Sequence, residues 1–469
     1  MITVKIEATL RNPFRSATQL KIMLNEDKGP RIIVEPPGPK AVKLIEADKR
    51  YIMQSFNRWY PLVVERGSGS YIYDVDGNKY LDFNAGIAVM SLGHANKSTI
   101  KAITEQAQKL MHYSFTDFLY EPATKLAEKL CEIAPQGPDS KVFFANSGAE
   151  ANEAMIKAAR WTTKRQYVLA FTGSFHGRTL GALSLTASKP VQRRYFGPLL
   201  PGVEHVPFPY CYRCPFKLEP SSCDFYCIDY IQEQTFRYTP PEETALFMAE
   251  AIQGEGGYIP APEGYFQKLK KLLDKHGILL GVDEVQSGMG RTGKWFAIEH
   301  FNVKPDYVSM AKALGGGLPL GALIGREELM ELDPGSHAST FGGNPVACAA
   351  GLSVFEEIEN RNLLQDVMRK GEYAMKRLRE IQAKHPIIGD VRGKGLMIGA
   401  ELVKNPDTKE PAKEELQRII VGAWKNGLVV IGAGESTIRL CPPLTITQDE
   451  LDIGLEILEK QIKNVEQKL

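Results

Sequence analysis

The sequence has no long hydrophobic run and almost no net charge. No stretch of about eighteen uncharged apolar residues, roughly the length that a membrane-spanning helix needs, occurs in the chain. The formal net charge of +1, without long basic runs, gives no electrostatic sign of nucleic-acid binding. The N-terminus, MITVKIEATLRNPFRS, lacks the apolar core of a secretory signal. These absences predict a cytoplasmic protein whose partners are small molecules.

Cysteine is scarce too, and seven residues in 469 exclude a secreted disulfide scaffold. Four of them nevertheless cluster in CYRCPFKLEPSSCDFYC, at Cys211, Cys214, Cys223 and Cys227. They could hold a structural zinc ion, form two disulfides, which in a cytosolic chain would indicate a thermophilic source, or stay free. Because their unequal spacings match no zinc pattern closely, the three alternatives stay open and no metal is assigned.

The chain is too long for one simple core, so we expect several structural units. We predict an N-terminal extension over residues 1–50, the first part of a small domain over 51–90, a large domain over 91–345 and the rest of the small α+β domain over 346–469. The segment YIYDVDGNKYLDF, residues 71–83, predicts a β-hairpin around its Asp-Gly turn. Residues 347–384 predict one long helical stretch.

Short apolar runs alternate with amphipathic segments in the middle of the chain. The predicted strands are residues 141–145, 167–171, 246–252, 278–282 and 307–310, and the predicted helices include 149–164 and 266–276. This alternation predicts an α/β fold with a mainly parallel sheet and helices on both faces.

Polar and reactive residues follow five of the predicted strands. They are Ser147 and Gly148, the segment from Phe175 to Arg178 that includes His176, Glu255, Asp283, and Lys312. Open parallel sheets bind ligands at the carboxyl ends of their strands, so we expect these residues to meet in one site.

Lys312 stands in SMAKALGGGLPL, among small and apolar neighbours and just before three glycines. Such neighbours desolvate the ammonium group, which favours a neutral amine that can attack a carbonyl carbon. The glycines allow the backbone to approach a ligand closely. This stretch therefore predicts a nucleophilic lysine, although taken alone it also fits a surface lysine before a turn.

Two further motifs fit a phosphate-bearing cofactor. Asn146-Ser147-Gly148-Ala149 begins a helix directly after a strand, and a helix N-terminus suits a phosphate; the alternative is a plain cap closed by Glu150. Asp283 ends an apolar strand and, if buried, needs a partner. A pyridinium N–H is such a partner, and backbone amides are another.

The order of these motifs resembles the pyridoxal-phosphate enzymes of the aspartate aminotransferase fold (fold type I). More closely, the chain from about Tyr60 onward resembles the class III aminotransferases, the family of 4-aminobutyrate, ornithine and acetylornithine aminotransferases and of related racemases. The motifs that carry the resemblance are NSGAEANEAMIKAAR, FHGRTLGALSLT, AIQGEGG, VDEVQSGMGRTGKWFA, SMAKALGGGLPLGA, STFGGNP and VRGKGLMIG.

The resemblance implies a role for each matching residue. Lys312 would bind pyridoxal 5'-phosphate covalently, and Asp283 would pair with its ring nitrogen. The remaining cofactor contacts would be Ser147, Gly148, Ala149, Phe175, His176, Val285 and Gln286, with Thr340 from a second subunit of a homodimer. Arg439 would bind the substrate α-carboxylate with Glu255 as its switch, Arg178 a distal carboxylate, and Ile87 would stand where 4-aminobutyrate enzymes have isoleucine and ornithine enzymes tyrosine.

We therefore predict an aminotransferase that moves an amino group from an amino acid, such as 4-aminobutyrate or ornithine, to a 2-oxo acid such as 2-oxoglutarate. The alternative is an amino-acid racemase or epimerase on the same scaffold. Both reactions begin with the same deprotonation, so the motifs do not separate them.

Overall fold

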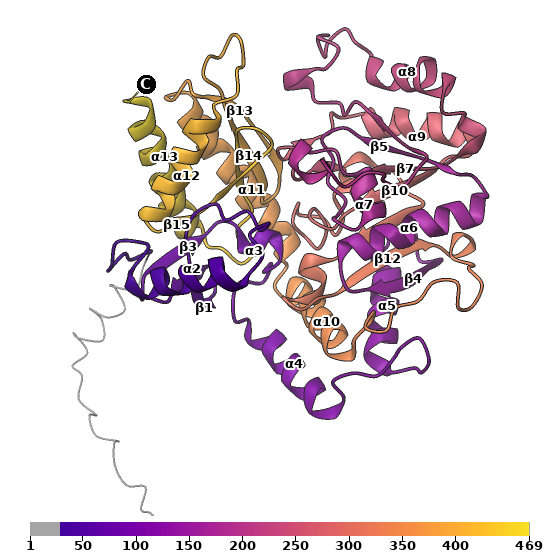
Figure 1. Ribbon diagram of the computed structural model, residues 1–469, viewed down its shortest axis with the longest axis horizontal. Helices are drawn as coiled ribbons and strands as arrows, with labels where there is room; N and C mark the ends of the chain where they lie inside the picture. Colours follow the sequence, from indigo (N-terminus) through magenta and orange to yellow (C-terminus); the bar gives the residue numbers. More distant parts are fainter. Residues whose placement is uncertain (1–28, 469) are drawn as a thin grey trace, which may run out of the picture.

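A computed structural model describes residues 29–468 of the chain. Residues 1–28 of the predicted N-terminal extension, including the stretch compared with secretory signals, lie outside the described residues. The described chain forms two groups of strands side by side, each with its own helices (Figure 1). Among the described helices, none has the length and apolar character needed to cross a membrane.

The larger group is a seven-stranded sheet of order β4-β12-β11-β10-β7-β5-β6. Its strands are β4 (Ser140–Ala145), β5 (Tyr167–Phe171), β6 (Val203–Val206), β7 (Thr244–Ala249), β10 (Leu279–Asp283), β11 (Tyr307–Met310) and β12 (Gly321–Arg326). Only β12 runs against its neighbours, pairing antiparallel with both β11 and β4. The predicted α/β fold with a mainly parallel sheet is confirmed.

The central strand β7 shows why these apolar runs become strands. All six of its residues are buried, and successive side chains point to opposite faces of the sheet. Leu246 and Met248 pack with the helix α6 (Gly148–Thr163), whereas Phe247 packs with α9 (Tyr265–His276) on the other face. A sheet covered on both faces needs apolar residues at every position, which the sequence supplies.

The smaller group contains two sheets. The predicted hairpin is confirmed as β2 (Tyr71–Asp74) and β3 (Lys79–Asp82), with β1 (Val64–Ser68) beside β2 and β15 (Leu428–Val429) parallel to β3. The second sheet has the order β13-β14-β17-β16, with β13 (Ile388–Lys394), β14 (Met397–Leu402), β16 (Ile431–Ala433) and β17 (Thr437–Leu440).

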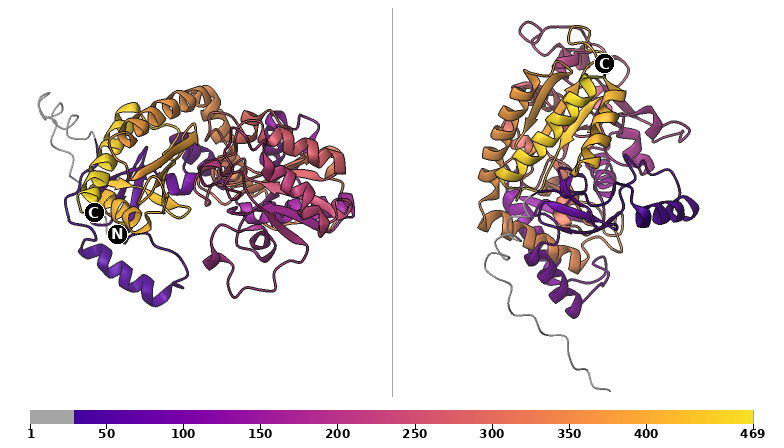
Figure 2. Two further views of the ribbon diagram at one scale, coloured as in Figure 1. Left: turned by 90° about the horizontal axis from the view of Figure 1, so that it is seen from above. Right: turned by 90° about the vertical axis from the view of Figure 1, so that its left-hand side faces the viewer.

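Helices complete both groups. They are α2 (Pro39–Tyr51), α3 (Ala85–Ala88), α4 (Lys97–Lys109), α5 (Glu121–Ile133), α7 (Leu180–Leu185), α8 (Tyr226–Glu233), α10 (Pro345–Asn360), α11 (Leu363–Gln382), α12 (Lys413–Lys425) and α13 (Gln448–Glu466). The last three pack on the sheets of the smaller group, and α12 and α13 lie on its side away from the seven-stranded sheet (Figure 1 and Figure 2).

Two predicted elements differ from the structure. The single helical stretch over 347–384 is wrong, because the chain breaks between α10 and α11, where Asn362 has a left-handed φ of 49°. The strand predicted over 246–252 ends at Ala249, and the next residues form a separate short hairpin of β8 (Ile252–Gln253) and β9 (Ile259–Pro260). The predicted domain boundaries stay a prediction.

Candidate active site

A cavity of about 460 Å³ lies at the carboxyl ends of the parallel strands. Ten of the predicted site residues line it: Ser147, Gly148, Ala149, Phe175, His176, Arg178, Asp283, Val285, Gln286 and Lys312. Residues that follow β4, β5, β10 and β11 thus meet around one space, as the strand-end argument predicts.

Lys312 comes two residues after the end of β11 and is half-buried at the cavity wall. Burial lowers the pKa of Lys312 below its ordinary value, and the nearby Asp283 offsets only part of this effect. The residue also has a left-handed φ of 48°, a conformation that is strained for a residue with a Cβ. A lowered lysine pKa favours the neutral amine that attack on a carbonyl requires.

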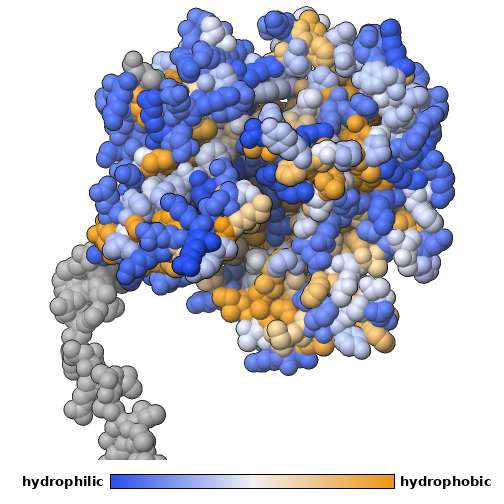
Figure 3. Space-filling view, in the orientation of Figure 1, coloured by the Kyte–Doolittle hydropathy of each residue, from blue (hydrophilic) through white to orange (hydrophobic). Residues whose placement is uncertain are grey.

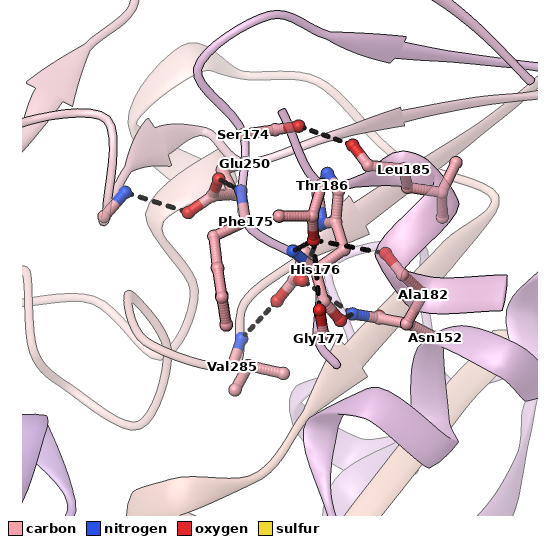
Figure 4. Close-up of polar contacts among 12 residues, drawn as sticks. Asn152, Ser174, Phe175, His176, Gly177, Ala182, Leu185, Thr186, Glu250 and Val285 are labelled. Atoms are coloured by element: carbon pink, nitrogen blue, oxygen red, sulfur yellow. Dashed lines mark hydrogen bonds and ion pairs between the residues drawn. The ribbon is translucent and has the colours of Figure 1, made fainter. Parts of the chain in front are cut away.

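Asp283 is the last residue of β10, and neighbours from other elements fix its carboxylate. Asn152 of α6 donates a hydrogen bond of 2.8 Å to Asp283 Oδ2, and His176 Nδ1 lies 2.8 Å from the same oxygen. Asn152 also donates to the backbone carbonyl of His176 at 2.7 Å, and Thr186 accepts from the His176 N–H (Figure 4). This network holds the carboxylate in one orientation at the cavity wall.

The N-terminus of α6 opens onto the same cavity. Ser147 caps the helix by accepting from the Glu150 N–H at 3.2 Å. The Glu150 carboxylate, however, accepts from the Asn146 N–H and side chain, so the capping box that we considered is absent at Ser147. A Cβ on Gly148 would lie 2.7 Å from Val285 Cγ2, so only glycine lets the helix start this close to Val285.

Gln286 and Phe175 each contact a neighbouring side chain. The Tyr258 hydroxyl donates to Gln286 Oε1 at 2.7 Å, which orients the side-chain amide. The guanidinium of the exposed Arg178 lies 5.4 Å from the centroid of the Phe175 ring, so the two predicted residues lie together at the rim of the cavity.

Glu250 is a cavity residue that we did not predict. It follows β7 directly, and its carboxylate accepts from the Phe175 and Gly254 N–H groups at 2.9 and 2.8 Å (Figure 4). Burial raises the pKa of Glu250 to about 7, although His176 lowers it in part. The sequence signal was a carboxylate after an apolar strand, the same signal that identified Asp283.

The raised pKa of Glu250 predicts a pH-dependent stability. Between about pH 4.5 and about pH 7, Glu250 is protonated in the folded chain but ionised in the unfolded chain. The protonated carboxyl therefore contributes its full stability below the ordinary pKa of 4.5, and this contribution is lost as the pH rises through about 7. Glu250→Gln keeps the neutral form at every pH. We expect wild type to lose on the order of 3 kcal/mol relative to this variant between about pH 5 and pH 8. Thermal midpoints of both proteins across this range measure it, and a constant difference would contradict the assignment.

Glu255 and Arg439 meet although 184 residues separate them in the sequence. Arg439, buried on β17, donates to Glu255 Oε1 at 2.7 Å, and Lys189 donates to Oε2 at 3.2 Å. Burial alone would raise the pKa of Glu255, but Arg439 and Lys189 outweigh it and lower the pKa to about 2. Lys189 is a second residue that the sequence reasoning missed, because nothing in the local pattern marks it.

Four predicted residues do not line the cavity: Glu255 and Arg439, which form the pair just described, and Ile87 and Thr340. Ile87, in the short α3, is partly exposed and has a left-handed φ of 64°, which is rare for a β-branched residue. Thr340 is exposed in the loop before α10. Neither lines the cavity of its own chain.

The four clustered cysteines surround a separate cavity of about 180 Å³ beside α8. All four are free thiols, and among residues 29–468 no group of three or more potential ligands has metal-binding spacing. The structure thus shows neither of the two disulfides that we considered.

Comparison with known proteins identifies the fold and the family. The family profile described as "Aminotransferase class-III" matches residues 53–462. The chain belongs to this family. The leucine/methionine racemase of Thermococcus litoralis is 46% identical to this class III chain, covering 87% of it and 92% of the relative. The acetylornithine aminotransferase of Archaeoglobus fulgidus is 43% identical, covering 88% and 99%.

A solved ω-transaminase of Pseudomonas jessenii, in complex with PMP, superposes on this class III aminotransferase with a TM-score of 0.85 and 30% identity, covering 90% of the chain and 98% of the transaminase. The predicted family, fold type and enzyme class are therefore confirmed, and the cofactor is pyridoxal phosphate.

The residues around the cavity fit this cofactor. A helix N-terminus, a fixed buried carboxylate and a half-buried lysine of lowered pKa open onto one space of about 460 Å³. These groups suit, in the same order, a phosphate, a protonated ring nitrogen and an aldehyde.

Proposed function

We propose that this aminotransferase moves an amino group from an amino acid such as 4-aminobutyrate or ornithine to 2-oxoglutarate, with Lys312 and Asp283 as its catalytic residues. Ser147, Gly148 and Ala149 hold the phosphate, Phe175 and Val285 lie on the two faces of the ring, and Gln286 bonds the ring hydroxyl. His176 positions the Asp283 carboxylate, which lies 2.8 Å from its Nδ1, and so acts on the ring through Asp283.

Bound pyridoxal phosphate supplies an aldehyde for the substrate amine and a ring that accepts electrons. Asp283 keeps the ring nitrogen protonated by pairing with it. Lys312, once its amine is free, takes the proton from the amine-bearing carbon and returns a proton later in the reaction. Desolvation lowers the pKa of Lys312, which favours the neutral Nζ that can accept that proton.

The pairing of Glu255 with Arg439 is the observation that carries this proposal. A transaminase alternates between an amine donor and a 2-oxo acid, and only some of these ligands place a carboxylate at Arg439. When none does, Glu255 neutralises the buried arginine at 2.7 Å. When a carboxylate binds, Glu255 moves aside and Lys189 still balances its charge. Arg178 at the rim would bind a distal carboxylate, whereas Ile87, which does not line the cavity of its own chain, receives no role.

Racemisation is the second candidate, because a racemase is among the chain's relatives. It needs a proton donor on the face of the substrate opposite Lys312. Arg439 and Lys189 lower the pKa of Glu255 to about 2, so its carboxyl carries no proton at neutral pH. This charge state excludes Glu255 as that donor, and the measurement below separates transfer from inversion.

The test is incubation of the purified enzyme with a panel of L-amino acids and 4-aminobutyrate, with and without 2-oxoglutarate. We expect glutamate to form only when both an amine donor and 2-oxoglutarate are present. D-amino acid formed without a 2-oxo acid would instead identify a racemase. Enzyme with the Lys312→Ala substitution is the blank for both measurements.

We also propose a cytoplasmic homodimer in which Thr340 reaches the phosphate site of the second subunit. Exposed apolar side chains gather beside Thr340, namely Met111, Tyr113, Phe118, Leu119 and Phe341. The loops that carry them are packed together, since His112 stacks on Phe341 with centroids 4.6 Å apart. Apolar residues are visible at this end of the molecule, around α4 (Figure 3). In the homodimer the second copy would cover this surface, and the mass of the protein in solution tests whether the dimer forms.

A further inference from the structure

The segment Gly254–Tyr258 connects the two groups of strands. It is the turn between β8 and β9 and carries Glu255. On the side of the seven-stranded sheet, the Gly254 N–H donates to Glu250 and the Tyr258 hydroxyl donates to Gln286. On the other side, the Gly434 N–H donates to the Glu255 carbonyl at 2.8 Å. Displacement of this backbone would therefore disturb the cavity wall as well as Glu255.

Two arginines on one face of the β13-β14-β17-β16 sheet contact this segment. Arg392 of β13 pairs with Gly399 of β14, and Gly399 pairs with Arg439 of β17. Directly opposed residues in antiparallel strands point to the same face, so the arginines flank a glycine. A Cβ on Gly399 would lie 3.1 Å from both the Gly257 carbonyl oxygen and Tyr258 Cβ. The missing side chain lets the segment lie against the sheet between the arginines.

The two arginines bind different parts of the segment. Arg439 binds the Glu255 carboxylate, whereas Arg392 donates to the backbone carbonyls of Gly257 at 2.7 Å and Tyr258 at 3.2 Å. The Arg439 contact involves a side chain, the Glu255 carboxylate, that a substrate carboxylate can replace. The Arg392 contacts involve backbone carbonyls, with which no substrate carboxylate competes.

Arg392 is itself fixed by an ion cluster that does not touch the cavity. Its guanidinium pairs with Asp390 at 2.7 Å and with Glu401 at 2.6 Å. Glu401 also pairs with Arg213 and accepts from the Tyr210 hydroxyl. Arg392 is buried, and its charge is balanced without Glu255, so opening of the Glu255–Arg439 pair leaves the Arg392 contacts intact.

We propose that Arg392 is a positioning residue that anchors the backbone of Gly254–Tyr258, so that only the Glu255 side chain moves when a substrate carboxylate binds Arg439. The inference rests on the proposed exchange at Arg439. It assigns a role to the VRGKGLMIG motif, which the proposed function does not otherwise use. Without the anchor, Glu255 would return poorly to Arg439, and ligands without a carboxylate there would face an unpaired buried cation.

The test variant is Arg392→Lys, which keeps the positive charge beside Asp390 and Glu401 but lacks the forked donors that reach two carbonyls. The matched control is Arg213→Lys, the same substitution at another arginine that pairs with Glu401 but makes none of the segment contacts described above. Both are made in the full-length holoenzyme.

The first measurement is hydrogen–deuterium exchange of a peptide that spans residues 254–258, with and without 2-oxoglutarate. We expect its amides to exchange about tenfold faster in Arg392→Lys, since charged hydrogen bonds to the backbone are lost, and Arg213→Lys to behave as wild type. The second is steady-state kinetics. We expect KM for 4-aminobutyrate to rise about tenfold in Arg392→Lys while KM for 2-oxoglutarate changes by less than about twofold.

Unchanged exchange at 254–258 in Arg392→Lys would overturn the inference whatever the substrate proves to be. Faster exchange with equal changes in both KM values would also overturn it, since that pattern indicates general loosening. If wild type transfers no amino group from any donor, the proposed function fails, and the exchange comparison still decides whether Arg392 anchors the segment.

Discussion

Replacing Lys312 with alanine abolishes amino-group transfer and removes the absorbance of the lysine-linked cofactor. We expect turnover to fall by about 10⁴-fold, since one Nζ serves both as the covalent attachment and as the proton carrier. No other described lysine lines the cavity, so no neighbour replaces it. The fold should persist, because alanine removes an amine whose burial is unfavourable.

The measurement pairs glutamate formation with the absorbance spectrum, and borohydride reduction followed by peptide mapping locates the covalent bond. Lys304→Ala is the control. Lys304 is an exposed lysine before the same strand β11, at the opposite edge of the sheet, and we expect wild-type turnover from it. Turnover within about tenfold of wild type in Lys312→Ala would contradict the scheme.

The site could be predicted wherever its residues directly follow an apolar strand. Asp283 and Lys312 each come at or just after a run whose buried character is visible in the sequence, and parallel strands bring such residues to one edge. Glu250 meets the same criterion. It was missed because the strand was predicted to continue to residue 252, which placed the carboxylate inside the strand instead of at its end.

What the sequence could not provide is contact between distant segments. Lys189 and Arg439 reach Glu255 from a loop after α7 and from β17 of the other strand group, and no local pattern encodes either approach. The strand β12 was missed for a related reason: GALIGR, with two glycines, has weak strand propensity and is held by antiparallel pairing on both sides. The break at Asn362 likewise depends on a single left-handed residue within a helical pattern.

Asp283→Asn is expected to lower kcat by about 10³-fold while the cofactor still binds. The amide cannot carry the charge that keeps a ring nitrogen protonated, so the ring accepts electrons less well when the proton leaves the substrate carbon. The phosphate site at the N-terminus of α6 and Lys312 are unaltered, so occupancy should survive. Stopped-flow half-reactions measure the chemical step, and the absorbance spectrum measures occupancy.

The control for this variant is Asp306→Asn at the opposite edge of the same sheet. Asp306 is as buried as Asp283, accepts from the Leu280 N–H at 2.7 Å and pairs with Arg326 at 3.0 Å. Its substitution should lower the thermal midpoint and leave kcat near the wild-type value. Similar losses of kcat in both variants would mean that Asp283 serves the fold. A loss of kcat in Asp283→Asn alone would mean that Asp283 acts in catalysis. Of these two buried carboxylates, only Asp283 lies at the carboxyl end of its strand, where the cavity is.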